Sequence, residues 1–217
     1  MRSPEGAAEA RPKVGRYYPP LLTSLMTSGA REKRRHVPLS TIPERMQQAV
    51  LAIEDQSFYS HPGFNPFRTI AAAISSLFSR GRPSGASTIT QQLSRMFFLE
   101  DEFNEELQSG TVSPLRKARE IMMSLVLERR TSKEEILELY LNEIYLGQRG
   151  SFAIHGVAEA ARLFFGKDVA NLSLSEAALI AGVIQSPGPR SPFANPERAV
   201  ERRNVVLSAM ADEEYVS

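Results

Sequence analysis

The sequence lacks the features by which several classes of protein are recognised. It contains no cysteine, which excludes a disulfide framework and thiolate metal sites but leaves the cellular compartment open. Its longest apolar stretches, such as 177–184, fall far short of the roughly 20 residues that a membrane helix needs. Residues 1–12 are small, polar and charged, without the apolar centre of a signal peptide. We therefore expect that any membrane anchor lies outside these 217 residues.

The chain also lacks an excess of charge of either sign. Its 26 Lys and Arg residues nearly balance 25 Asp and Glu residues, so net charge identifies no partner and gives no reason to expect nucleic acid. A hydrophobic content of 42% and a charged content of 24% are typical of a globular protein of one domain. We predict an extended or disordered basic segment, a folded domain and a short tail, at residues 1–36, 37–211 and 212–217.

Helical signals dominate from Thr41 onward. Thr41 and Glu44 form a capping-box pattern with Pro43 in the first turn, and Met46 then begins a buried face. Capping patterns also begin at Thr88, Ser132 and Ser173. The predicted fold is mainly α with a small extended or β element near the N-terminus, at 17–28. The predicted helices are 41–54, 66–78, 88–98, 115–130, 132–144, 152–165, 174–184 and 197–210, and the acidic 100–114 connection is predicted to be a long loop.

Two charged segments have both a plain and a functional interpretation. The basic cluster from Arg31 to Arg35 is either a solvated loop or a contact for anionic lipid headgroups. Glu54 and Asp55 follow an apolar helical face, where a carboxylate loses water on one side and becomes suited to accept a proton. The alternative for this pair is a solvated acidic helix end. His61 is more typical of a structural imidazole than of a metal ligand.

Segment 85–92 places hydroxyls and amides at a helix start. Capping explains Thr88 and Gln91, whereas Ser87, Thr90 and Gln92 suit the binding of phosphate or sugar hydroxyls.

The helix from residue 115 has an apolar stripe through Ala118 and Met122 and a second stripe that opens with Glu120. Two such stripes predict a central helix. A buried Glu120 needs either a salt bridge, for example to the neighbouring Arg116 and Lys117, or a function.

Taken in order, these segments resemble glycosyltransferase family 51, the transglycosylase domains of penicillin-binding proteins, over about residues 37–210. The motifs that carry the resemblance are Glu54-Asp-x-x-Phe58-x-x-His61-x-Gly63, Gly85-x-Ser-Thr-Ile-Thr-Gln-Gln92, Arg116-Lys-x-x-Glu120, Ile136-Leu-Glu-x-Tyr140-Leu-Asn142 and Glu201-Arg-Arg-Asn204. The sequence departs from the family at the long 100–115 connection and at Arg190, which stands where Tyr is usual. It contains no Ser-x-x-Lys, the motif of a transpeptidase domain.

The resemblance implies a lysozyme-like helical domain in two lobes that polymerises lipid II on the outer, periplasmic face of the bacterial cytoplasmic membrane. Its partners would be lipid II, the lipid-linked glycan chain, the membrane surface and other cell-wall synthesis proteins. No cofactor is required, although a divalent cation could act at the pyrophosphate, and no metal site is expected in the protein. Glu54 would be the catalytic base and Glu120 the second catalytic residue. The implied substrate-binding residues are Asp55, Phe58, His61, Ser87, Thr88, Thr90, Gln91, Gln92, Arg95, Arg116 and Lys117.

Two other functions compete with this one. A peptidoglycan hydrolase would need an acid to protonate the leaving sugar and would gain nothing from clustered cations. An inactive module that binds lipid II or partner proteins would not need both Glu54 and Glu120. On physical grounds we expect a membrane-facing edge at Phe97, Phe98 and Leu99, because the lipid tail of the substrate stays in the bilayer.

Overall fold

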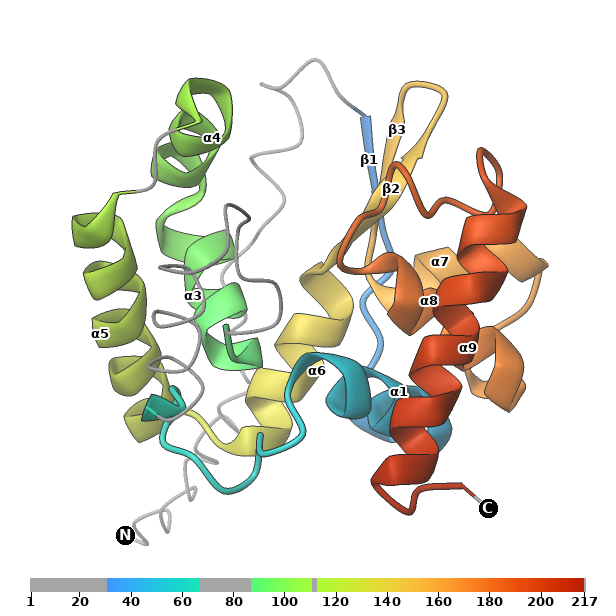
Figure 1. The fold of residues 1–217 in the computed structure, drawn as a ribbon, viewed down its shortest axis with the longest axis horizontal. Coiled ribbons are helices and arrows are strands. Elements are labelled where there is room, and N and C mark those ends of the chain that lie inside the picture. The colour runs from blue at the N-terminus through green and yellow to red at the C-terminus, as the bar shows by residue number, and fades with distance from the viewer. Residues whose placement is uncertain (1–30, 67–86, 111–112, 217) are drawn as a thin grey trace, which may run out of the picture.

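The computed structural model describes residues 31–66, 87–110 and 113–216 and gives a mainly helical molecule with one small sheet (Figure 1). The segments at 1–16 and 17–28 and nearly all of the predicted helix 66–78 lie outside the described residues. The helices are α1 (Glu44–Glu54), α3 (Ile89–Phe98), α4 (Glu100–Ser109), α5 (Pro114–Arg130), α6 (Lys133–Glu143), α7 (Val157–Phe165), α8 (Leu174–Val183) and α9 (Pro196–Asp212). Single 3-10 turns lie at Leu39–Thr41 and Val169–Asn171.

The helices form two lobes that meet at α6. Figure 1 shows α3, α4 and α5 on one side of the molecule and α1, α7, α8 and α9 on the other. Helix α6 packs against α3 on one side and against α7 on the other, so it connects the lobes. The mainly α fold expected from the sequence is confirmed.

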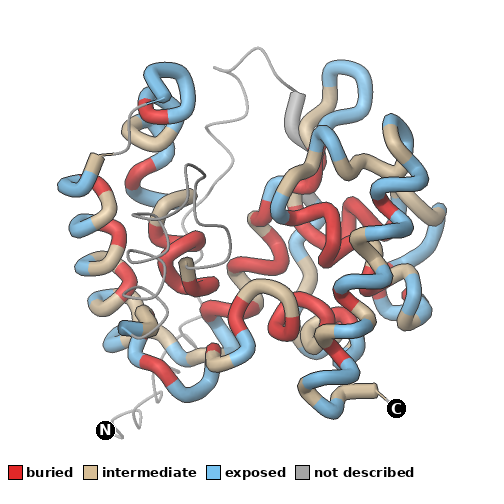
Figure 2. Tube along the Cα trace, viewed as in Figure 1, coloured by how far each residue is buried: buried red, intermediate tan, exposed pale blue. Residues whose placement is uncertain are grey.

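The apolar core lies mostly in the lobe of α1, α7, α8 and α9. Helix α8 packs against both α1 and α9 and buries Ala177, Ile180 and Val183 completely. Figure 2 shows the buried residues concentrated there and along α6. Because each fully buried aliphatic side chain contributes about 1.5–3 kcal/mol, this lobe is a stable base for the loops beside it.

Three of the four predicted helix caps are confirmed. Thr88, Ser132 and Ser173 each accept a hydrogen bond from the backbone N–H three residues later, in complete capping boxes. The cap predicted at Thr41 is wrong, because Thr41 lies in a 3-10 turn and α1 begins after Pro43 without a side-chain cap.

The predicted 100–114 loop is also wrong, since most of it is the helix α4. Three acidic residues in the first turn stabilise the helix because their negative charges lie at the positive end of the helix dipole. Gly110 ends the helix in the left-handed conformation, with a φ of 69°.

The structure contains a three-stranded sheet where the sequence predicted a basic loop and the start of a helix. The strands are β1 (Arg31–Arg34), β2 (Tyr145–Arg149) and β3 (Phe152–His155), with β3 parallel to β1 and antiparallel to β2. The basic 31–34 segment is therefore a strand and not a loop, and the predicted helix 152–165 begins only at α7. Gly156 separates strand from helix with a φ of 78°, and a Cβ there would lie 2.5 Å from the carbonyl oxygen of Asn142.

Helix α5 is not a central helix, contrary to the prediction. The residues it buries are Arg116, Glu120 and Ser124, on the side that packs against α3. Its other stripe is outward, with Met122 53% exposed. The prediction of a central helix is wrong because the stripe through Ala118 and Met122 is exposed, whereas the stripe that opens with Glu120 is buried.

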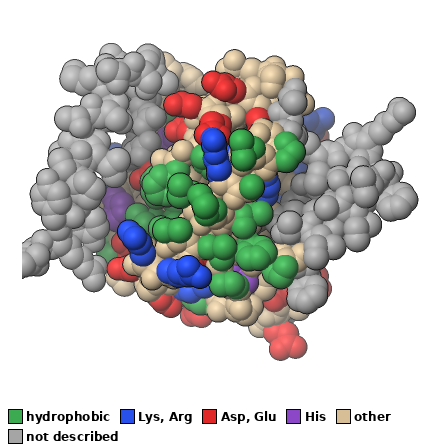
Figure 3. All heavy atoms as spheres, turned by 90° about the vertical axis from the view of Figure 1, so that its left-hand side faces the viewer, with side chains coloured by type: hydrophobic (Ala, Val, Ile, Leu, Met, Phe, Trp, Pro, Cys, Tyr) green, Lys and Arg blue, Asp and Glu red, His purple; other side chains and the backbone are tan. Residues whose placement is uncertain are grey.

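Helices α3, α4 and α5 carry exposed large apolar side chains, which we call the apolar patch: Phe97, Phe98, Leu107, Leu115, Met122 and Val126. Two of them, Phe97 and Leu107, also line a pocket between the lobes. Figure 3 shows hydrophobic side chains gathered on this side of the molecule, with lysines and arginines among them. Leu99, expected at the same edge, is buried, so that part of the prediction is wrong. Within the described ranges, no helix is long and apolar enough to cross a membrane.

Candidate active site

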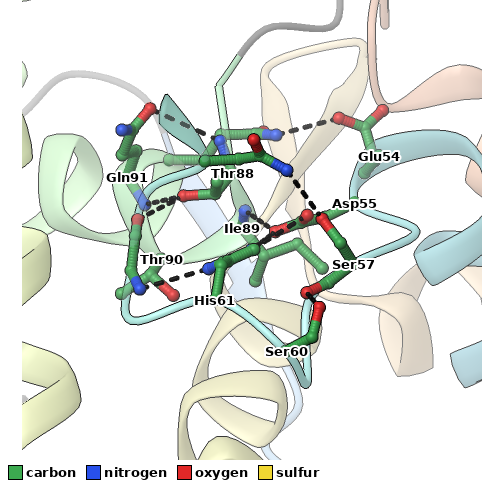
Figure 4. Close-up of polar contacts among 12 residues, drawn as sticks. Glu54, Asp55, Ser57, Ser60, His61, Thr88, Ile89, Thr90 and Gln91 are labelled. Carbon is green, nitrogen blue, oxygen red and sulfur yellow. Dashed lines mark hydrogen bonds and ion pairs between the residues drawn. The ribbon is translucent and has the colours of Figure 1, made fainter. Parts of the chain in front are cut away.

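Glu54 is the last residue of α1, and its half-buried carboxylate is directed toward α3 (Figure 4). The Nε2 of Gln92 donates a hydrogen bond of 2.9 Å to the Oε2 of Glu54. The hydroxyl of Tyr140, on α6, donates one of 3.0 Å to the Oε1 of the same amide. Because an amide donates only from nitrogen, the contact with Tyr140 turns the Gln92 N–H toward Glu54.

Tyr140 keeps its proton in this arrangement. Complete burial raises the pKa of Tyr140 well above its usual value, and the negative charge of Glu54 raises it further. The hydroxyl is therefore protonated at neutral pH, where it donates to the Gln92 amide and orients it.

A cavity of about 750 Å³ lies between the two lobes beside this pair. Helix α3 contributes Gln92 and Arg95 to its lining, and α4 contributes Phe103. The opposite wall comes from the sheet and from the turn that follows α8, including Tyr145 and Gln185. The amide that holds Glu54 thus faces a space large enough for a sugar-sized ligand.

Asp55 is fully buried and directed into the protein. Its carboxylate accepts from the Nε2 of His61 at 2.8 Å and from the backbone N–H of Ile89 at 3.0 Å. The N–H of Gly63 donates to the Nδ1 of His61, so the proton of a neutral ring lies on Nε2, facing Asp55. This pair fastens the start of α3 to the end of α1. Phe58 is fully buried as well, with the Nζ of Lys133 4.5 Å from its ring centroid.

The hydroxyls at the start of α3 mostly have partners inside the protein. Thr88 donates to the carbonyl oxygen of Gly63 at 2.6 Å, and Thr90 donates to Glu128 at 2.6 Å. Ser87 accepts from the Nζ of Lys117 at 3.0 Å. These contacts account for the polar residues of this segment by structure, and direct contact of its side chains with substrate stays a prediction.

Lys117 and Glu120, on α5, form a buried ionic centre next to α3. The Nζ of Lys117 lies 2.6 Å from the Oε1 of Glu120 and donates to the Oε1 of Gln91 at 3.1 Å. Glu120 has no exposed surface, which a carboxylate tolerates only when cations pair with it. Burial lowers the pKa of Lys117, and the attraction of Glu120 opposes this effect.

Arg116 is held between two carboxylates. Its Nη1 lies 2.5 Å from the Oε2 of Glu120, and its Nε lies 2.8 Å from the Oε1 of Glu106 on α4. Burial alone would lower the pKa of Arg116, but the contacts with Glu106 and Glu120 outweigh it and raise the pKa. Helix α4, absent from the prediction, therefore supplies a carboxylate to the ionic centre.

Arg95 stands closest to the open space among these cations. It is half-buried, lines the cavity and stacks its guanidinium 4.4 Å from the ring centroid of Phe103. Its charge acts on both Lys117 and Tyr140, where it contributes to lowering the pKa values.

Two consecutive residues of α3 connect the acid to the cations. Gln92 contacts Glu54, and Gln91 contacts Lys117. The structure thus places Glu54, on α1, and the ion pair of Lys117 and Glu120, on α5, beside the same helix, α3. It places Asp55, Phe58 and His61 behind that helix start as its support.

Sequence reasoning missed Tyr140 and Glu106 as parts of the site. Tyr140 was named only as part of the 136–142 motif, although a buried tyrosine hydroxyl usually has a hydrogen-bond partner and could have been marked for that reason. In the part of the chain that the structure describes, no group of three or more His, Asp or Glu side chains could hold a metal ion.

Comparison with known proteins identifies the family to which the chain is similar. A family model described as transglycosylase matches residues 21–211. Penicillin-binding protein 1A of Vibrio cholerae is 46% identical over 187 residues, which cover 86% of this chain and 21% of that protein. Penicillin-binding protein 1B of Escherichia coli is 38% identical over 197 residues, covering 91% and 22%. A crystal structure of penicillin-binding protein 1A from Haemophilus influenzae aligns with a TM-score of 0.48 and 30% identity, over 86% of this chain and 16% of that one.

The chain therefore belongs to the transglycosylase family, and it is a glycosyltransferase domain of the kind found in class A penicillin-binding proteins. It spans about a fifth of the length of the curated relatives named above.

Proposed function

We propose that this chain is a peptidoglycan glycosyltransferase that polymerises lipid II into β-1,4-linked glycan strands and releases undecaprenyl pyrophosphate. The observation that carries the proposal is the pairing along α3, where Gln92 holds the carboxylate of Glu54 and the adjacent Gln91 contacts the partly exposed ammonium group of Lys117. Transfer from a diphosphate donor needs a base for the acceptor and cations for the leaving group, and both are present here.

Glu54 acts as the base in this proposal. Its carboxylate accepts the proton of the acceptor GlcNAc 4-hydroxyl while that oxygen attacks the anomeric carbon of the donor. The new C–O bond forms on the face opposite the diphosphate, whose bond to that carbon breaks, so the anomeric carbon inverts. The proton later passes from Glu54 to water. A positioned base of this kind contributes about 10²- to 10⁴-fold in rate.

Lys117 and Arg95 bind the departing diphosphate. Diphosphate is already a good leaving group and needs charge rather than a proton. Arg95 lines the cavity, and Lys117 is about one-third exposed. Arg116 is 6% exposed and paired with two carboxylates, so we assign it a role through its electric field. Glu120 orients both neighbouring cations.

The apolar patch on α3, α4 and α5 supports contact with a membrane surface. The lipid tails of both substrates stay in the bilayer, so the cavity has to open close to it. The patch lies on the same lobe as Arg95 and Lys117. We therefore place the reaction at the outer face of the cytoplasmic membrane.

Incubation with labelled lipid II, and separately with finished glycan, tests the proposal against the hydrolase alternative. We expect polymer from lipid II and no cleavage of glycan. Cleavage of glycan without polymerisation would replace the proposal by a hydrolase. A divalent cation at the diphosphate stays a prediction, which turnover with and without a chelator tests.

A further inference from the structure

A second group of cations lies on the lobe opposite Lys117. Arg190, Arg198 and Arg202 line a hollow of about 440 Å³ between the turn that follows α8 and the first half of α9. Glu201 lines it as well, so three positive charges face one negative charge. Arg190 and the Glu201-Arg-Arg-Asn204 motif were both marked in the sequence, and the proposed reaction gives neither a role.

The side chain of Arg202 packs closely against Gly182 on α8. A Cβ at Gly182, on α8, would lie 3.0 Å from the Cγ of Arg202, so the glycine lets the arginine stem cross α8. The Nε of Arg202 is buried and has no hydrogen-bond partner. A buried guanidinium nitrogen without a partner carries a desolvation penalty that a bound anion would remove.

The positive charges of the hollow are poorly compensated. Among the described residues, no carboxylate lies within ion-pair distance of Arg190, Arg198 or Arg202. Burial lowers the pKa of Arg202, and the neighbouring charge of Arg190 lowers it further. The charge of Glu54 opposes this lowering, and Glu201 lines the same hollow, so the three guanidinium groups share nearby negative charge without an ion pair of their own in the described ranges.

The hollow adjoins the candidate active site. Ile184, Gln185 and Pro187 line the large cavity, whereas Ser186, Pro189 and Arg190 of the same turn line the hollow. Arg190 donates to the side chain of Gln185 at 2.6 Å, which couples the two spaces. The charge of Glu54 also acts on Arg202. In Figure 1, α8 and α9 lie across the molecule from α5.

We propose that Arg190, Arg198 and Arg202 form a second anion site, which binds an oxyanion carried by the acceptor substrate. This inference rests on the proposed function, in which Lys117 and Arg95 already hold the donor diphosphate. The acceptor bears its own diphosphate and the carboxylates of its peptide, and its attacking hydroxyl has to reach Glu54. A guanidinium fork binds phosphate and carboxylate oxygens alike, so either group suits the site.

Direct binding tests the site without any turnover. The side-chain Nε–Hε signal of Arg202 is followed by NMR while inorganic pyrophosphate, and separately a peptide with two carboxylates, is added to the full chain. We expect a saturable shift with at least one probe, and the tighter probe identifies the group that binds. In Arg190→Gln and Arg198→Gln, binding weakens about tenfold, since each loses one charged contact.

Arg203→Gln is the matched control, because it removes the same charge from α9 while Arg203 itself contacts Asn204 outside the hollow. The inference is overturned by an Arg202 signal that does not saturate, or by Arg203→Gln weakening binding as much as the other two variants.

Turnover then connects the site to the reaction. We expect Arg190→Gln to raise the KM for lipid II about tenfold with kcat within about twofold, because it weakens acceptor binding but leaves Glu54 in place. An unchanged KM in an active enzyme contradicts the inference alone. A wild-type chain that turns over no lipid II contradicts the proposed function, while the NMR result still decides the anion site.

Discussion

The two lobes of this molecule are stabilised by different interactions. In the lobe of α1, α7, α8 and α9, the buried side chains are almost all apolar, as at Val50, Ile180 and Val206. In the lobe of α3, α4 and α5, helix α5 buries Arg116, Glu120 and Ser124, and α4 buries Glu106. Several large apolar side chains of this second lobe, such as Met122, are exposed, although Ile89 and Leu93 on α3 are fully buried.

This contrast assigns a task to each lobe. The apolar lobe holds Glu54 at the end of α1, where packing against α8 and α9 makes its backbone rigid. The ionic lobe brings cations to the cavity and presents an apolar surface. Buried charges contribute less to stability than apolar packing does, so we expect the second lobe to be the less stable of the two.

The largest expected effect is on the free energy of unfolding, and it should differ between substitutions in the two lobes. Ile180→Ala removes a fully buried side chain from α8 and should lower the free energy of unfolding by about 2–5 kcal/mol. Met122→Ala truncates an exposed side chain on α5 and should change it by less than about 0.5 kcal/mol. Urea unfolding of both variants measures the free energy of unfolding. Equal losses in the two variants would contradict the difference between the lobes.

Lys117→Gln should affect activity rather than stability. Turnover of lipid II should fall about 10²- to 10³-fold, because one donor to the diphosphate is lost, while Glu120 keeps its contact with Arg116. Since burial lowers the pKa of Lys117, its charge is lost at a lower pH than that of an ordinary lysine, and wild-type turnover should decline there. Lys117→Arg should move that alkaline limb to higher pH.

The matched control is Lys167→Gln, which removes the same charge from a surface pair with Glu176. Its turnover should equal that of the wild type. A similar loss in both variants would mean that total charge, and not the ionic lobe, supports the reaction.

A smaller effect is expected where the two lobes meet. Tyr140→Phe frees the Gln92 amide to rotate, so Glu54 loses a fixed N–H donor that favours its ionised form. Turnover should fall roughly five- to tenfold, and the acidic limb of the pH–rate profile should move to higher pH. Tyr59→Phe, which removes a hydroxyl from an exposed tyrosine, should leave the profile unchanged. A uniform loss without a shift in pH dependence would show that Tyr140 only supports packing.

The smallest effect concerns the apolar patch. Met122→Ser should weaken binding to anionic liposomes about threefold, because part of one apolar side chain leaves the interface. Val200→Ser on α9 removes a comparably exposed side chain from the other lobe and should leave binding unchanged. Sedimentation with liposomes measures both, and equal weakening would remove the distinction between the surfaces.

Local patterns predicted the helices and much of the site, whereas long-range contacts escaped prediction. The caps at Thr88, Ser132 and Ser173 were predictable because each depends on residues three positions apart. The sheet was not, since β1 pairs with β3 across more than a hundred residues and short strands carry little periodicity of their own. Tyr140 was missed as a functional residue for the same reason, because its contact with Gln92 arises only when α6 packs against α3.

The most direct test of the account compares turnover and binding of lipid II in Glu54→Gln. The substituted amide keeps the size of the side chain but cannot accept the proton of the acceptor hydroxyl. We predict that turnover falls about 10²- to 10⁴-fold while lipid II binds within about threefold of the wild type. Polymerisation at the wild-type rate by Glu54→Gln would contradict the central claim that this carboxylate is the base.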